Sequence, residues 1–171
     1  ADISPLSDLP ELGRLDVPGQ PELSDLTALK SLPIIYLELQ KTGLSDLSPL
    51  RGKPLIYLHL CGNLHLSDIS PVRDSSFENG LCIHQTGIVD ISSLKGAPVQ
   101  KITLLASQYD ADIVASWPSL TSIDFAGTIG EIPREKVLRL KDLKTLAFID
   151  GQSAAEFWKE YEADSKSHES P

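Results

Sequence analysis

Seven short pairs of apolar residues recur along the chain at a nearly constant spacing. Each pair has the pattern apolar-x-apolar, and successive pairs begin 22, 21, 23, 21, 21 and 23 residues apart. The pairs are Leu15/Val17, Leu37/Leu39, Leu58/Leu60, Leu81/Ile83, Ile102/Leu104, Ile123/Phe125 and Leu146/Phe148. Self-similarity at such a short period is the signature of a solenoid, in which each repeat packs only on its neighbours. The period therefore predicts a scaffold that displays a long surface, and it favours binding over catalysis.

The residues around each pair predict two halves of a repeat. Residues 33–39 read Pro-Ile-Ile-Tyr-Leu-Glu-Leu and residues 54–60 read Pro-Leu-Ile-Tyr-Leu-His-Leu, an alternation typical of a strand with one buried face. A second signature follows, as in Leu-Ser-Asp-Leu-Ser-Pro-Leu over residues 44–50. Its apolar residues recur every third position, which is the spacing of a 3₁₀ turn, and its Asp can accept backbone N–H bonds there.

This strict alternation resembles the leucine-rich-repeat family. The L-x-x-L-x-L-x-x-N core of that family stands here as residues 55–63, Leu-Ile-Tyr-Leu-His-Leu-Cys-Gly-Asn. The short unit with Asp-Leu-Ser-Pro-Leu looks like the bacterial internalin and SDS22 subtype, and the resemblance covers roughly residues 3–149. It implies an α/β fold: a leucine-rich-repeat solenoid arc with about seven parallel strands on the concave face, 3₁₀ turns and short helices on the convex face, and a C-terminal helical cap.

The repeats depart from the family pattern in three places. Only Asn63 keeps the family's ninth-position asparagine, whose amide satisfies backbone groups of neighbouring turns. Hydroxyl residues, which can do part of that work, stand at the matching positions Thr42, Thr86, Ser107 and Thr128. In the fourth copy Glu78 occupies the first core position, where Phe77 beside it can fill the layer. Residues 109–117 and 132–140 replace the Ser-Asp signature and predict short helices.

The N-terminal and C-terminal segments of the chain predict different structures. Residues 1–152 form the repeat array, which starts mid-repeat and suggests the C-terminal piece of a larger protein. Residues 153–162, which contain Phe157 and Trp158, predict an amphipathic helix that covers the last core layer. Residues 163–171 are small and polar, so we expect a disordered tail.

The net charge and the lack of known catalytic motifs narrow the range of functions that the sequence favours. A net charge of −9 argues against nucleic acid or an anionic membrane as the partner. No phosphate-binding loop, HExxH, GxSxG or calcium-loop pattern occurs. We therefore expect no enzyme and no cofactor, but a monomeric module for a protein or peptide ligand.

Side chains that flank the core positions of each strand are expected on the concave face. Tyr36 and Tyr57 fall on neighbouring strands, about 4.8 Å apart, and exposed tyrosines are favoured binding anchors; alternatively, they merely cover the sheet. In the last copy Thr145 and Ala147 take the flanking positions. The candidate ligand-binding residues are Tyr36, Glu38, Tyr57, His59, Cys82, His84, Lys101 and Asp124.

Both cysteines and two histidines form a rectangle on this face, with His59 beside Cys82 and Cys61 beside His84. Cys₂His₂ is a familiar zinc set, although a flat rectangle does not favour a tetrahedron, and four unrelated surface residues are the alternative. A Cys–His nucleophile would lack an orienting third group. The diagonal cysteines are expected roughly 8 Å apart by Cα, beyond the ~7 Å limit for a disulfide. Free thiols would favour a reducing compartment.

Three functional hypotheses follow. The first is a protein-recognition domain in a larger, cytoplasmic bacterial sensor or signalling protein. The second is a fragment of an exported, internalin-like adhesin, which would place the chain outside the cell. The third is a metal-binding regulatory module that uses His59, Cys61, Cys82 and His84.

Overall fold

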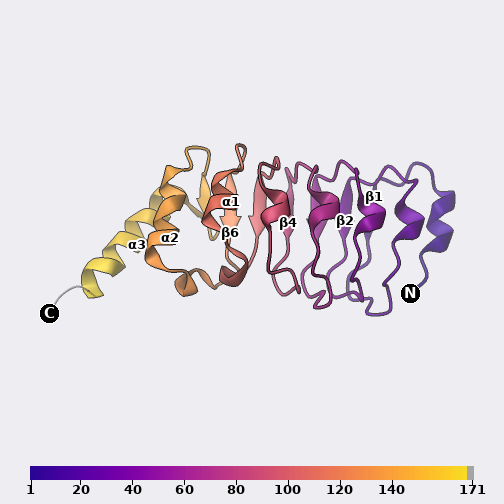
Figure 1. Ribbon diagram of the computed structural model, residues 1–171, viewed down its shortest axis with the longest axis horizontal. Helices are drawn as coiled ribbons and strands as arrows, with labels where there is room; N and C mark the ends of the chain where they lie inside the picture. The colour runs from indigo at the N-terminus through magenta and orange to yellow at the C-terminus, as the bar shows by residue number, and fades with distance from the viewer. Residues whose placement is uncertain (169–171) are drawn as a thin grey trace.

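The computed structural model describes residues 1–168 as an elongated stack of repeats, with the two ends of the chain at opposite ends of the molecule (Figure 1). One sheet runs through the stack in the order β1-β2-β3-β4-β5-β6-β7-β8. The strands are β1 (Arg14–Asp16), β2 (Tyr36–Glu38), β3 (Tyr57–His59), β4 (Gly80–Cys82), β5 (Lys101–Thr103), β6 (Ser122–Asp124), β7 (Phe148–Ile149) and β8 (Gln152–Ser153). Strands β1 to β7 pair in parallel, as predicted, and β8 turns back antiparallel to β7.

Tight helical turns form the side of each repeat opposite the sheet. Four of the 3₁₀ turns, over residues 27–29, 48–50, 70–72 and 92–94, end the four copies of the second signature, and two short α-helices replace it near the C-terminus, as the sequence predicts. The elements are η1 (Ser4–Asp8), η2 (Thr27–Leu29), η3 (Ser48–Leu50), η4 (Ser70–Val72), η5 (Ser92–Leu94), η6 (Ala106–Gln108), α1 (Ala111–Ala115), η7 (Ile129–Glu131), α2 (Arg134–Leu138), η8 (Arg139–Asp142) and α3 (Ala154–His168).

The core lies between the sheet and these turns. The middle residue of each central strand points inward, and Leu37, Leu58 and Leu81 are almost fully buried. Phe77 is fully buried beside the exposed Glu78, so it fills the layer that lacks an aliphatic residue. The first and third residues of β1–β6 flank these buried centres; we call the surface that they form the strand face, which corresponds to the predicted concave face.

The last parallel strand differs from the prediction. Ile149, not Leu146, pairs with Ile123, so the seventh strand begins three residues later than the repeat period indicates. Phe148 is therefore not a core residue but is 49% exposed beside Ser122. The physical reason is that α2 and η8 lengthen the preceding connection. Thr145 and Ala147 consequently do not take the predicted flanking positions.

A long helix covers the C-terminal end of the stack. Helix α3 begins at Ala154 and packs Phe157 against the core. It continues to His168, past the predicted end of the cap at residue 162 and into the segment for which the sequence predicts disorder. The remaining residues of that predicted tail, 169–171, lie outside the described residues. No helix in the described part of the chain is long and apolar enough to cross a membrane.

Candidate functional site on the strand face

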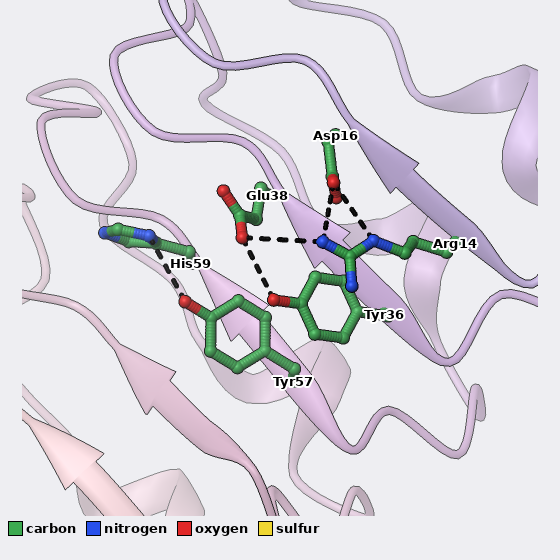
Figure 2. Close-up of polar contacts among 6 residues, drawn as sticks. All are labelled: Arg14, Asp16, Tyr36, Glu38, Tyr57 and His59. Atoms are coloured by element: carbon green, nitrogen blue, oxygen red, sulfur yellow. Dashed lines mark hydrogen bonds and ion pairs between the residues drawn. The ribbon is translucent and has the colours of Figure 1, made fainter.

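Two tyrosines form a stack at the centre of the strand face. Tyr36 and Tyr57 lie in register on β2 and β3, and their rings stack with centroids 4.3 Å apart and planes 18° apart (Figure 2). The Arg14 guanidinium lies over the other face of Tyr36, 3.8 Å from the ring centroid. The parallel register places equivalent residues of successive repeats side by side. Arg14, Tyr36 and Tyr57 therefore form a ladder of stacked side chains. The predicted neighbourhood of the two tyrosines is thus present.

Two acidic side chains hold the Arg14 and Tyr36 end of the ladder in place. Asp16 accepts hydrogen bonds from Arg14 Nε and Nη2, at 3.0 and 2.7 Å. Glu38 accepts the Tyr36 hydroxyl hydrogen bond at 3.0 Å and lies 4.0 Å from Arg14 Nη2. Figure 2 shows this network. Burial and the Glu38 hydrogen bond raise the pKa of Tyr36, and burial, with the neighbouring Tyr36, raises that of Tyr57. Both hydroxyls therefore stay protonated to a higher pH than that of a free tyrosine.

The other face of Tyr57 meets no side chain from the next strand, since the equivalent residue is Gly80. A Cβ placed on Gly80 would lie 3.7 Å from Tyr57 Cε2, and its φ of +137° is one that L side chains rarely adopt. Beside it lies an open depression of about 430 Å³, which we call the Gly80 depression. Its lining includes Tyr57, His59, Gly80, Cys82, Lys101 and Asp124. His84 lines it as well, so six of the eight predicted ligand-binding residues contribute to one hollow.

Two residues of this site were not predicted from the sequence. Arg14 stood in the same column as the tyrosines, so its stacking could have been anticipated from the register. Gly80 was detectable in a different way, because an isolated glycine inside a strand often marks a place where another group approaches the backbone.

The cysteines and histidines also come together, at the edge of the Gly80 depression. The structure joins Cys61 to Cys82 in a disulfide, with Cα atoms 6.0 Å apart. The prediction of free thiols is therefore wrong. It assumed that the straight strand continues to Cys61, whereas β3 ends at His59 and the chain turns, with Gly62 at a φ of +83°. The argument from free thiols for a reducing compartment no longer stands.

The two histidines lie against this disulfide. His84 Nδ1 lies 3.1 Å from each sulfur atom. His59 lies on the Tyr57 side, with its Nδ1 3.5 Å from the Tyr57 hydroxyl and the two rings edge to face. Burial lowers the pKa of His59, and Glu38 opposes this shift. The predicted cluster is present, and within it Cys61 is buried whereas the other three side chains are half-buried.

Comparison with known proteins rests on structure alone. No family model matches the chain, and no curated protein matches it. Among solved structures, internalin InlF from Listeria monocytogenes superposes with a TM-score of 0.65 at 24% identity, over 87% of this chain. The fold is an internalin-like leucine-rich-repeat solenoid. The chain spans about half the length of that internalin, 50% of it.

The leucine-rich-repeat fold confirms the architecture expected from the sequence. Stacked repeats of this kind present a long, extended surface rather than an enclosed site. The Gly80 depression is likewise an open hollow on the surface and not an enclosed site. The strand face offers stacking, hydrogen-bonding and charged groups.

Proposed function

We propose that the chain is a protein-recognition domain whose strand face binds an extended segment of a partner. The observation that carries this proposal is the incomplete ladder: Arg14, Tyr36 and Tyr57 stack in successive repeats, and the next place, over Gly80, holds no side chain. A planar side chain from the partner, aromatic or arginine, would complete the stack.

Energetics favour this position as the anchor. Tyr57 is held from behind by Tyr36, so little side-chain freedom is lost when a ligand packs on its open face. Aromatic pairs contribute ~0.5–1.5 kcal/mol beyond area burial, and a cation over a ring contributes a similar amount. The partner can continue along the depression to Lys101 and Asp124, where opposite charges fix its orientation.

A peptide display library selected on the wild-type domain tests the proposal. Selected peptides are expected to share an aromatic residue or arginine and to bind Tyr57→Ala at least tenfold more weakly. The double variant Tyr36→Ala/Tyr57→Ala should lose capture while its thermal melt stays nearly unchanged. Phe148→Ala is the matched control, since it removes an exposed ring from β7, outside the depression. Selected peptides that bind the double variant as tightly as wild type would move the site off this surface.

The parent protein belongs to the same proposal. A bacterial cytoplasmic sensor or signalling protein that carries this domain fits the repeat style. The Cys61–Cys82 disulfide favours the exported, internalin-like alternative, because disulfides persist mainly in oxidising compartments. Fractionation of the native host, with an antibody to this domain, distinguishes the two: recovery in the cytoplasm supports the sensor, and recovery outside the cell supports the adhesin.

A further inference from the structure

The disulfide and its two histidines form a compact set of four metal-binding side chains at the edge of the Gly80 depression. The ligand atoms of His59, Cys61 and Cys82 all lie within 4.8 Å of one another. His84 Nδ1 adds a fourth, 3.1 Å from both sulfur atoms. We propose that reduction of the Cys61–Cys82 bond turns this cluster into a Cys₂His₂ zinc site.

The spacing suits a tetrahedral ion. With Zn–S near 2.3 Å and Zn–N near 2.0 Å, the edges of a tetrahedron measure about 3.3–3.8 Å. The two His84 contacts are slightly shorter than this range, and the His59 ligand atom lies within 4.8 Å of both sulfur atoms, about an ångström beyond it. Cys61 and His84 lie beyond the ends of β3 and β4, so the four side chains do not project from two straight strands as the flat rectangle assumed.

The backbone already holds the ligands in place. Leu60 N–H donates to the Cys82 carbonyl at 2.9 Å, and Gly62 N–H donates to the Gln85 carbonyl at 3.1 Å. These bonds tie the two cysteine-bearing segments together whether or not the sulfur atoms are joined. The thiolates can therefore separate by rotation of their side chains. The Tyr57 hydroxyl beside His59 Nδ1 is the kind of outer contact that orients a metal-binding histidine.

The reaction balances with a dithiol as reductant. The dithiol supplies two electrons and two protons, closes to its own disulfide, and leaves Cys61 and Cys82 as thiols. Zinc then displaces both thiol protons, so two thiolates and two neutral imidazoles surround one divalent ion with no net charge. The oxidised chain has no thiolate to offer, so binding depends on the redox state of the pair.

Zinc titration of the two redox states tests the inference. The oxidised protein and protein reduced with a phosphine, desalted without oxygen, are each titrated with zinc in competition with a chromophoric chelator. Reduced wild type is expected to bind one zinc per chain, and the oxidised protein none at the same free zinc. Cobalt in place of zinc should give the visible bands of a tetrahedral ion with thiolate charge transfer.

Single variants assign the ligands. His84→Ala and His59→Ala should each weaken zinc binding by tenfold or more, whereas His65→Ala should not, since His65 is exposed in the same repeat but outside the cluster. Circular dichroism checks that each variant still folds. If a variant unfolds, the comparison of oxidised with reduced wild-type protein still tests the inference. Equal zinc uptake by both redox states, no uptake by the reduced state, a cobalt spectrum without thiolate bands, or an equal loss in His65→Ala would each overturn the inference.

Discussion

The Asn63 side chain reaches into the preceding repeat and accepts two hydrogen bonds from Thr42, from its backbone N–H at 3.1 Å and from its hydroxyl at 2.6 Å. The same amide donates to the carbonyls of Leu39 and Leu60, at 2.8 and 2.6 Å. Asn63 is 1% exposed, so water does not replace these bonds. One side chain therefore satisfies polar groups of two repeats at once, where the sheet ends and the chain turns.

Asn63→Ala should be strongly destabilising. It leaves the buried Thr42 N–H without a partner and removes one of the two hydrogen bonds to each of the Leu39 and Leu60 carbonyls, at a cost of about 1–3 kcal/mol. The midpoint of denaturant unfolding should fall accordingly. Asn79→Ala, which removes an exposed amide, should change stability by less than ~0.5 kcal/mol. Equal midpoints for the two variants would show that the inter-repeat bonds contribute nothing measurable.

Gln108 takes over the same task two repeats later. Its amide donates to the carbonyls of Ile83 and Ile88, at 3.0 and 2.8 Å, and its oxygen accepts the Leu105 N–H at 2.8 Å. The sequence pattern had assigned this position to Ser107, which is exposed. Gln108→Ala should therefore cost about 1–3 kcal/mol, and Ser107→Ala almost nothing. Thermal melts of this adjacent pair check the assignment, and the reverse order would restore the sequence-based register.

The sequence predicts the strands well because their register follows from one strict rule. An inward Leu or Ile between two outward residues leaves one pairing that buries the apolar set, so Tyr36 and Tyr57 could be placed side by side from the period alone. The rule fails wherever the chain leaves the straight strand. Cys61 lies beyond the end of β3, and its distance from Cys82 is set by a turn that the repeat period does not describe.

Two further errors share that cause. The extra length of α2 and η8 shifts β7, which places Phe148 on the surface. Gln108 replaces Ser107 because η6 forms directly after β5, where its longer side chain can reach back to the preceding repeat. Gly80 is a different case, because it lies inside β4 and the open space beside Tyr57 follows from its lack of a side chain.

Acid should loosen the turns of the first repeats. Hydrogen bonds from Ser48, from its hydroxyl and its N–H, lower the pKa of Asp46 below 3.8, and Asp25 and Asp90 are lowered in the same way by Thr27 and Ser92. A lowered pKa in the folded state means that these contributions are complete above pH 3.8 and are lost as pH falls below it.

The triple variant Asp25→Asn/Asp46→Asn/Asp90→Asn tests this dependence. Asparagine keeps an oxygen acceptor but does not titrate, so the melting temperature of the variant should fall less steeply in acid than that of wild type. Asp8→Asn, an exposed change in η1, serves as the control and should leave the slope unaltered. A triple variant with the wild-type acid slope contradicts the role given to these turns.

Alkaline pH should act at the other end of the stack, through Tyr109. Its hydroxyl donates to the Lys136 carbonyl at 3.1 Å, its ring meets Phe125 edge to face, and burial raises its pKa from 10.0 to about 12. Because the folded pKa exceeds the unfolded one, this contribution is complete below pH 10 and is lost as pH rises towards 12. Lysines and the other tyrosines titrate in the same range, so wild type alone is not diagnostic.

Tyr109→Phe isolates the effect: it should be less stable than wild type at neutral pH, through the lost hydrogen bond, and the gap should narrow as pH approaches 12. Parallel denaturant titrations of the two proteins measure the gap, and a constant difference across that range would mean that the Tyr109 hydroxyl ionises as readily in the folded chain as in the unfolded one.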